Sequence, residues 1–272
     1  MQKLTNKKLG IFTWFGHRIP IPERANLIQE AGFKTVLIWW DDSFLELEKL
    51  TKEEQANIYR KSGLDIENAH LQFSTVNHLW FDTQDGQAVF ENYLSDIDGL
   101  AEHGVSTAVL HLSSGADAPP VSDIGMHRIR KLTERAEKHD MRIALENVRD
   151  THILSHVLDS VESPALGLCY DSGHDYVWSK APHELLGKYR NRLFAVHLHD
   201  NMGVNDDHLA PGEGKVDWGA VLAGVGDSVY SGSYTLEVDG AGVSAAETPR
   251  EYLLSCYESA VRVFGLVPQS SY

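Results

Sequence analysis

The sequence predicts an α/β protein folded as a single (β/α)8 barrel over residues 1–272. Eight short segments rich in β-branched and aromatic residues recur at even intervals, and helix-forming segments lie between them. Dividing 272 residues by eight gives 34 per unit, about the length of a strand, a helix and two loops. No G-x-G-x-x-G turn follows the first strand, so an open dinucleotide-binding sheet would lack its phosphate loop. The regular repetition therefore favours the closed barrel.

The expected strands are mostly apolar on both faces, which is typical of parallel strands covered by helices. They span residues 9–15, 35–40, 65–71, 107–112, 142–146, 166–171, 193–200 and 233–238. The helix expected at 22–32 begins with proline and ends with glycine, and the helix at 51–63 begins with TKEE, a capping box. Longer helices are expected at 85–103, 122–139 and 248–264, where apolar residues follow helical spacing.

Composition narrows the classes of protein to which the chain can belong. Hydrophobic residues make up 42% and charged residues 23%, as in ordinary globular domains, which excludes disordered and fibrous proteins. No segment approaches the roughly 20 apolar residues of a membrane-spanning helix, and the N-terminus lacks the apolar core of a secretory signal. Cys169 and Cys256 are too few for a disulfide framework and fit a reducing compartment. We therefore expect a cytoplasmic protein with no membrane partner.

The net charge of −15, from 24 basic and 39 acidic residues, argues against a nucleic-acid partner. Binding to nucleic acid depends largely on Lys and Arg side chains that neutralise phosphates. The 14 histidines are the more informative excess, because several of them lie where a barrel of this kind would form its active site.

Imidazoles and carboxylates follow the expected strands at their C-terminal ends, which form the active-site face of such barrels. These residues are His70, His111, Glu146, Asp171, His174, His197, Asp206, His208 and Glu237. Together they offer the ligand types that bind divalent ions such as Mn, Co, Mg or Zn. Glu146, Asp171, His197 and Glu237 come from strands five to eight and converge from different directions. We expect these four to hold one ion with open positions for a substrate.

Aromatic residues end the first two strands. Trp14 and Trp40 are expected to line the substrate pocket, because an aromatic ring can stack on the apolar face of a sugar. The alternative is that they only close the top of the barrel core. His70, His111 and His208 are assigned to the substrate or to further metal ions.

Several motifs resemble those of the xylose-isomerase-like TIM-barrel superfamily. They are LEN at Glu146, LGLCYDSGHD around Asp171 and His174, HLHD at His197, PGEGKVDW at 211–218 and LEVD at Glu237. The superfamily includes sugar isomerases, ketose 3-epimerases, inosose dehydratases and endonuclease IV. The resemblance implies that the four converging residues are the shared metal ligands, and its sugar enzymes imply a homo-oligomer.

The resemblance to ketose 3-epimerases implies a metal-dependent isomerase or epimerase that acts on a small sugar or sugar derivative. Glu146 and Glu237 would exchange the proton beside a metal-polarised carbonyl through an enediolate, and His174 would assist at the substrate oxygen. Glu146 is the first choice for the base. An unphosphorylated substrate is expected, because no paired Arg and Ser stand at one strand end.

The resemblance to endonuclease IV leaves a second interpretation open, a zinc-dependent hydrolase that cleaves phosphodiesters at abasic sites in DNA. All nine ligands of its three zinc ions have counterparts here. The resemblance therefore implies additional metal ligands beside the first four: His70, His111, His174, Asp206 and His208. Asp41 and Asp42, however, would repel phosphates at the mouth of the barrel. An inosose-type dehydratase, which uses the same enediolate chemistry, is a further alternative.

Overall fold

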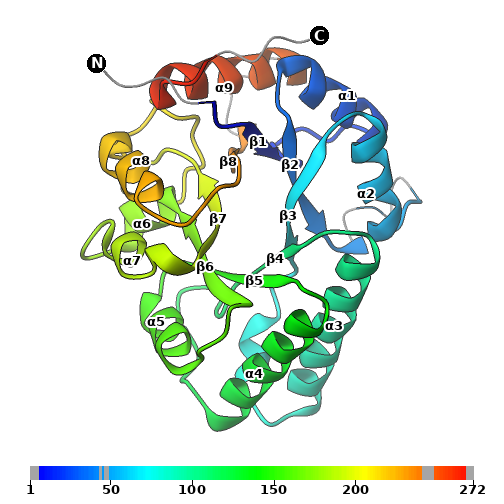
Figure 1. Ribbon diagram of the computed structural model, residues 1–272, viewed down its shortest axis with the longest axis vertical. Coiled ribbons are helices and arrows are strands. Elements are labelled where there is room, and N and C mark those ends of the chain that lie inside the picture. The colour runs from blue at the N-terminus through cyan, green and yellow to red at the C-terminus, as the bar shows by residue number, and fades with distance from the viewer. Residues whose placement is uncertain (1–5, 43–44, 46–48, 241–247, 268–272) are drawn as a thin grey trace.

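The computed structural model describes residues 6–42, 45, 49–240 and 248–267. Eight parallel strands form a closed barrel in the order β1 to β8, and β8 pairs with β1 (Figure 1). The strands are β1 Leu9–Phe12, β2 Thr35–Trp40, β3 Asp65–Leu71, β4 Thr107–Leu110, β5 Arg142–Glu146, β6 Leu166–Asp171, β7 Leu193–Leu198 and β8 Tyr234–Leu236. This architecture confirms the predicted (β/α)8 barrel.

Four of the strands, β2, β3, β5 and β6, span the residues expected from the sequence. The other four end earlier, because their last residues leave the sheet at the C-terminal edge of the barrel. Phe15, Leu112 and Val238 lie beyond these ends and are still buried. An apolar segment in this sequence therefore indicates burial at the mouth of the barrel as well as pairing in the sheet.

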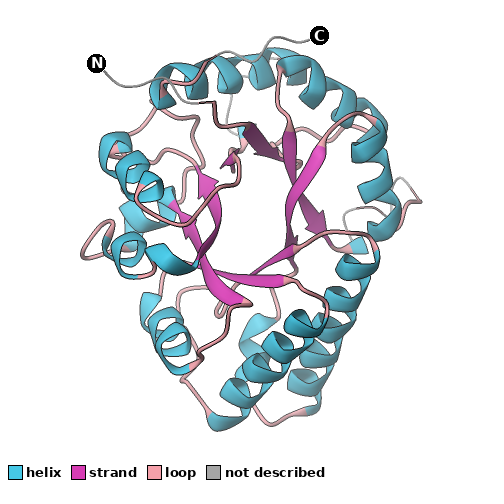
Figure 2. Ribbon diagram, in the orientation of Figure 1, coloured by secondary structure: helices cyan, strands magenta, loops and turns pink. Residues whose placement is uncertain are grey.

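A ring of helices surrounds the strands (Figure 2). The helices are α1 Ile21–Ala31, α2 Lys52–Lys61, α3 Gln84–Glu102, α4 Asp123–Lys138, α5 Thr151–Ser160, α6 Ser172–Trp178, α7 Glu184–Lys188, α8 Trp218–Gly226 and α9 Pro249–Phe264, with 3₁₀ turns at Val76–Trp80 and Arg190–Arg192. The capping box of α2 is confirmed, since Thr51 Oγ1 accepts from the Glu54 N–H at 3.3 Å and the Glu54 carboxylate accepts from the Thr51 N–H at 2.9 Å. Within the described part of the chain, no helix is both long and apolar enough to span a membrane.

A small apolar layer fills the barrel interior directly beneath the expected site. Its buried members each stand two positions before a candidate site residue on the same strand or its extension. The pairs are Val109 and His111, Ala144 and Glu146, Cys169 and Asp171, and Ala195 and His197. Because side chains two apart share one face of a strand, this layer forms the floor on which the polar residues rest.

Candidate active site

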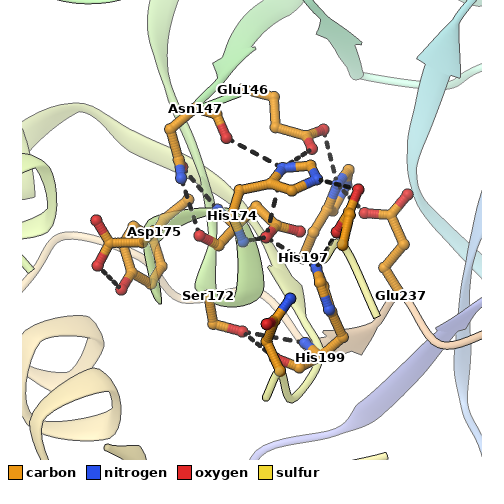
Figure 3. A network of polar contacts seen from close by, with 12 residues as sticks. Glu146, Asn147, Ser172, His174, Asp175, His197, His199 and Glu237 are labelled. Carbon is orange, nitrogen blue, oxygen red and sulfur yellow. Dashed lines mark hydrogen bonds and ion pairs between the residues drawn. The ribbon is translucent and has the colours of Figure 1, made fainter. Parts of the chain in front are cut away.

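The four converging residues stand at the C-terminal ends of consecutive strands. Glu146 ends β5, Asp171 ends β6, His197 lies in β7 beside Asp171, and Glu237 directly follows β8. Each is buried, with at most 8% of its surface exposed. One ligand atom from each of the four lies within 4.8 Å of the others. Figure 3 shows Glu146, His197 and Glu237 turned toward one another.

Five buried polar atoms of this cluster form no hydrogen bond with any described residue. They are Glu146 Oε2, Asp171 Oδ2, Glu237 Oε2 and both ring nitrogens of His197. His197 Nδ1 lies 2.9 Å from the oxygens of both Glu146 and Glu237, yet neither contact has the angles of a hydrogen bond. A buried polar atom without a partner costs about 1–3 kcal/mol, and more if it is charged. Three carboxylates and one imidazole therefore fit a divalent cation as their common partner.

The electrostatics keep the carboxylates ionised. Burial opposes the charge on Glu146, but His197 and His111 hold the pKa of this carboxyl well below its ordinary value. Burial also opposes the charge on Glu237, and His197 nevertheless lowers its pKa to about 2. Burial raises the pKa of the Cys169 thiol to about 12, so this neighbour remains a neutral thiol in the floor. Oxygen and nitrogen, without thiolate sulfur, are the available donors.

The four converging residues are the first cluster of candidate ligands. A second cluster, of His70, His111 and Glu146, shares Glu146 with it. His70 Nε2 lies 3.1 Å from His111 Nε2 and 3.3 Å from Glu146 Oε2. The other ring nitrogen of His70 lies 2.7 Å from the Leu71 carbonyl oxygen, which in the donating tautomer leaves Nε2 with its lone pair toward the cluster. A ring nitrogen tied to a carbonyl is the usual support of a metal-binding histidine.

A third cluster lies between the start of α6 and the loop after β7. His174 Nε2 and His208 Nε2 lie 3.2 Å and 3.3 Å from the same oxygen of Asp206. Their Nδ1 atoms face the carbonyls of Asn147 and Glu237 at 3.1 Å and 2.7 Å. Burial opposes the charge on His208, but its hydrogen bond to Asp206 raises its pKa to about 9. The structure thus brings together all nine polar residues that the strand ends predicted.

The loop that carries Asp206 and His208 is held in place by Asp200. Its carboxylate accepts from the N–H groups of Gly212 and Val216 at 2.8 Å and 2.9 Å, and from Trp218 Nε1 at 3.0 Å. These donors all belong to the PGEGKVDW motif. The motif therefore serves to fold the loop back on the end of β7, which positions the third cluster.

His199 lies at the end of the seventh expected strand, and no role was predicted for it. Its Nε2 lies 3.0 Å from Asp171 Oδ1, which leaves Asp171 Oδ2 free of partners among the described residues. His199 is fully buried, and its ring stacks on His208 with centroids 4.0 Å apart. It stands two residues after His197, and side chains two apart on a strand point to the same face. This spacing could have placed His199 in the site.

Gly173 provides the space for the His199 ring. A Cβ atom at Gly173 would lie 1.9 Å from the nearest ring atom, so alanine there must displace the imidazole. We expect Gly173→Ala to lower stability by about 1–3 kcal/mol, as overpacking of a rigid site does, and to weaken metal binding about tenfold or more because Asp171 loses its support. Thermal unfolding and calorimetric metal titration measure the two effects.

The control for this substitution is Gly187→Ala in α7, where no atom lies within 4 Å of the added Cβ. Alanine is the better helix former, so this variant should be as stable as the wild type or slightly more stable. Equal metal affinity in the Gly173 variant and the control would contradict the role given to His199.

The pocket above the clusters has two lobes that meet at Phe73, His208 and Glu237. The smaller lobe, about 220 Å³, has aromatic walls formed by Phe12, Trp14, Trp39 and Phe73. The larger lobe, about 350 Å³, contains the second and third clusters, and we name it the polar lobe because most of the residues that line it are polar. Trp14 therefore lies where the sequence predicts, at the wall of the pocket.

The two tryptophans at the end of β2 point to opposite sides of the strand, as successive residues do. Trp39 faces the site, and its ring stacks on the His70 ring with centroids 5.0 Å apart. Trp40 is 1% exposed and packs on the helix side of the barrel, with its ring centroid 6.1 Å from that of His103. The expectation that Trp40 lines this pocket is therefore wrong, and Trp39 occupies the position.

The fold and the clustered ligands define a (β/α)8 barrel with a candidate metal centre at the C-terminal ends of its strands. The sequence profile of the xylose isomerase-like TIM barrel family matches residues 25–256, and the chain belongs to this family.

Relatives of the chain have different descriptions. The protein y4fM of Sinorhizobium fredii (strain NBRC 101917 / NGR234) is 26% identical over 77% of this chain and 78% of its own length. Fructoselysine 3-epimerase of Escherichia coli O157:H7 is 29% identical over 40% of this chain and 43% of its own. Probable endonuclease 4 of Thermoplasma volcanium (strain ATCC 51530 / DSM 4299 / JCM 9571 / NBRC 15438 / GSS1) is 22% identical over 74% of this chain and 77% of its own.

Solved structures share the fold at low identity. L-ribulose 3-epimerase superposes with a TM-score of 0.76 at 14% identity and covers 95% of both chains. The IOLI protein, with a bound zinc atom, has a TM-score of 0.74 at 16% identity over 95% of this chain and 98% of its own. A xylose isomerase-like TIM barrel/4-hydroxyphenylpyruvate dioxygenase fusion protein has a TM-score of 0.77 at 19% identity over 95% of this chain, which spans 43% of the fusion.

Proposed function

We propose that this protein is a metal-dependent isomerase or epimerase of a small sugar or sugar derivative. The observation that carries the proposal is the set of buried, unpartnered ligand atoms from Glu146, Asp171, His197 and Glu237. These four residues would hold Mn, Co, Mg or Zn, and the bound ion would supply Lewis acidity toward a substrate carbonyl. The fructoselysine 3-epimerase relative and the zinc-containing structure of the same fold support this assignment.

Glu146 and Glu237 would move the proton. Both are ionised at neutral pH, and both reach the same nitrogen of His197 at 2.9 Å, so they converge on one small volume. Glu146 removes the proton beside the substrate carbonyl to give an enediolate. Glu237 takes up a proton from water and returns it to another face or carbon, while Glu146 releases its own proton to water. An epimer or an isomer results, according to the carbon that receives it.

His174 would assist at the substrate oxygen. Burial opposes its charge, but Asp171 and Asp206 raise its pKa well above the ordinary value, so it remains a hydrogen-bond donor at neutral pH. Its Nδ1 also lies 3.2 Å from Glu146 Oε1, which places it beside the base. His70, His111 and His208 line the lobes on either side and would contact the sugar hydroxyls, with Trp14 against its apolar face.

The second candidate is a multinuclear zinc hydrolase that acts on abasic DNA. The second and third ligand clusters favour it, as does the similarity to a probable endonuclease 4. Against it, the residues that line the two lobes include one arginine and no lysine among those that the structure describes. A site for a DNA backbone needs several such contacts to phosphates. An inosose-type dehydratase, which begins with the same proton removal, belongs with the first candidate.

Metal content per chain is the first test, measured by elemental analysis of protein purified without added metal. The sugar enzyme predicts one tightly held divalent ion and deuterium uptake from D₂O beside the carbonyl of a ketose. Two or three zinc ions with cleavage of abasic DNA would favour the hydrolase instead. Protein that neither contains nor takes up a divalent ion would overturn both.

A further inference from the structure

The polar lobe contains one permanent cation among the described residues that line it. Arg149, in the loop after β5, lines the 350 Å³ lobe together with the carboxylates of Glu146, Asp206 and Glu237. Its side chain is exposed and forms no ion pair with any described residue. By contrast, Arg192 donates to three main-chain carbonyls and serves the fold. The guanidinium of Arg149 is therefore available to a ligand.

An aromatic stack holds Arg149 beside the candidate metal ligands. Its guanidinium carbon lies 5.2 Å from the centroid of the Trp178 ring. That ring in turn stacks on His174, with centroids 4.7 Å apart and planes at 19°. A guanidinium that stacks on a ring contacts it through its flat face. The stack therefore restricts the position of the guanidinium and leaves its N–H groups free to donate to a ligand.

Ser113 faces the same lobe from the neighbouring strand end. It follows β4, which pairs with β5, and it lines the lobe that Arg149 lines. Ser113 is 4% exposed, and its hydroxyl forms no hydrogen bond with a described residue. A guanidinium and a free hydroxyl are suited to a carboxylate or a phosphate, which accepts charge-assisted hydrogen bonds from both.

We infer that Arg149 and Ser113 bind an anionic group, a carboxylate or a phosphate, at the end of the substrate remote from the reacting carbon. The inference rests on the proposed sugar isomerase or epimerase, and it specifies the substrate as an acidic or phosphorylated sugar. The carbon chain would extend from the aromatic lobe past Glu237 into the polar lobe. The absence of an Arg and Ser pair at one strand end therefore does not exclude an anion site, because Arg149 and Ser113 line one lobe from two neighbouring strand ends.

Three matched ketoses test the inference on metal-loaded protein: D-fructose, D-fructuronate and D-fructose 6-phosphate. They differ only at the terminal carbon, which carries a hydroxyl, a carboxylate or a phosphate. Deuterium uptake from D₂O, followed by NMR, reports proton exchange, and calorimetry reports binding. We expect tighter binding and faster exchange for one of the two anionic sugars. We expect Arg149→Gln to weaken binding of that sugar about 100-fold and of D-fructose less than about threefold.

Arg130→Gln, on the exposed face of α4, is the matched control and should change nothing. Equal binding of all three sugars, or an equal loss for all three in Arg149→Gln, overturns the anion site and leaves the proposed function intact. Anion binding that depends on Arg149, without any proton exchange, supports the anion site and counts against the proposed function. The preferred anion distinguishes carboxylate from phosphate. No binding of either anion overturns the inference.

Discussion

Glu146→Gln is expected to reduce proton exchange on the substrate by about a thousandfold, within the range of 10²–10⁴ that a general base contributes. The amide keeps the shape of the side chain but removes its charge and its ability to accept a proton. Glu146 also contacts His70 at 3.3 Å and His197 at 2.9 Å, so it joins two of the ligand clusters. No other substitution in the pocket removes the proposed base and a shared ligand together.

Two measurements separate these contributions. Deuterium exchange gives the loss of turnover, and elemental analysis of the same sample gives the loss of metal. If metal is restored by titration and exchange remains low, the carboxylate itself is needed for proton transfer. Glu258→Gln, on an exposed face of α9, is the control and should behave as the wild type. Normal exchange in the Glu146 variant would remove the basis of the proposed reaction.

Much of the fold follows from the sequence, because its signals are local. The capping box at Thr51 and the regular recurrence of apolar strands predict helices and strands directly. The positions of the candidate ligands follow as well, since the C-terminal ends of parallel strands in a barrel meet at one face. This rule alone predicts that Glu146, Asp171 and His197 lie close together, as they do in the structure.

What the sequence could not predict depends on side-chain direction and on contacts between distant segments. The strand TVLIWW is apolar throughout because both of its faces are buried, so no alternation distinguishes Trp39 from Trp40. Likewise, Arg149 and Ser113 each look like ordinary loop residues in the sequence. Only the pairing of β4 with β5 brings them to one lobe of the pocket.

Removal of the metal ion is expected to lower thermal stability, since the three buried carboxylates of the first cluster then face one another without a cation. Ligand binding to the native state adds about 4 kcal/mol to the free energy of unfolding when the free ligand concentration is a thousand times the Kd. For a chain of this length, that corresponds to a fall in Tm of about 10 °C on removal. Differential scanning calorimetry before and after chelation measures it, with elemental analysis to show that the metal has gone.

The substitution Asp171→Asn shows whether the shift arises at this cluster. Asp171 is fully buried and its Oδ2 lacks a partner among the described residues, so asparagine removes one charge that the ion would neutralise. The variant should lose most of the difference between metal-loaded and metal-free protein. Asp82→Asn, at an exposed position, should retain it. If complete removal of metal leaves the Tm of the wild type unchanged, these buried oxygens are stable without a cation. The fit of the cluster to a divalent ion would then no longer support the proposed function.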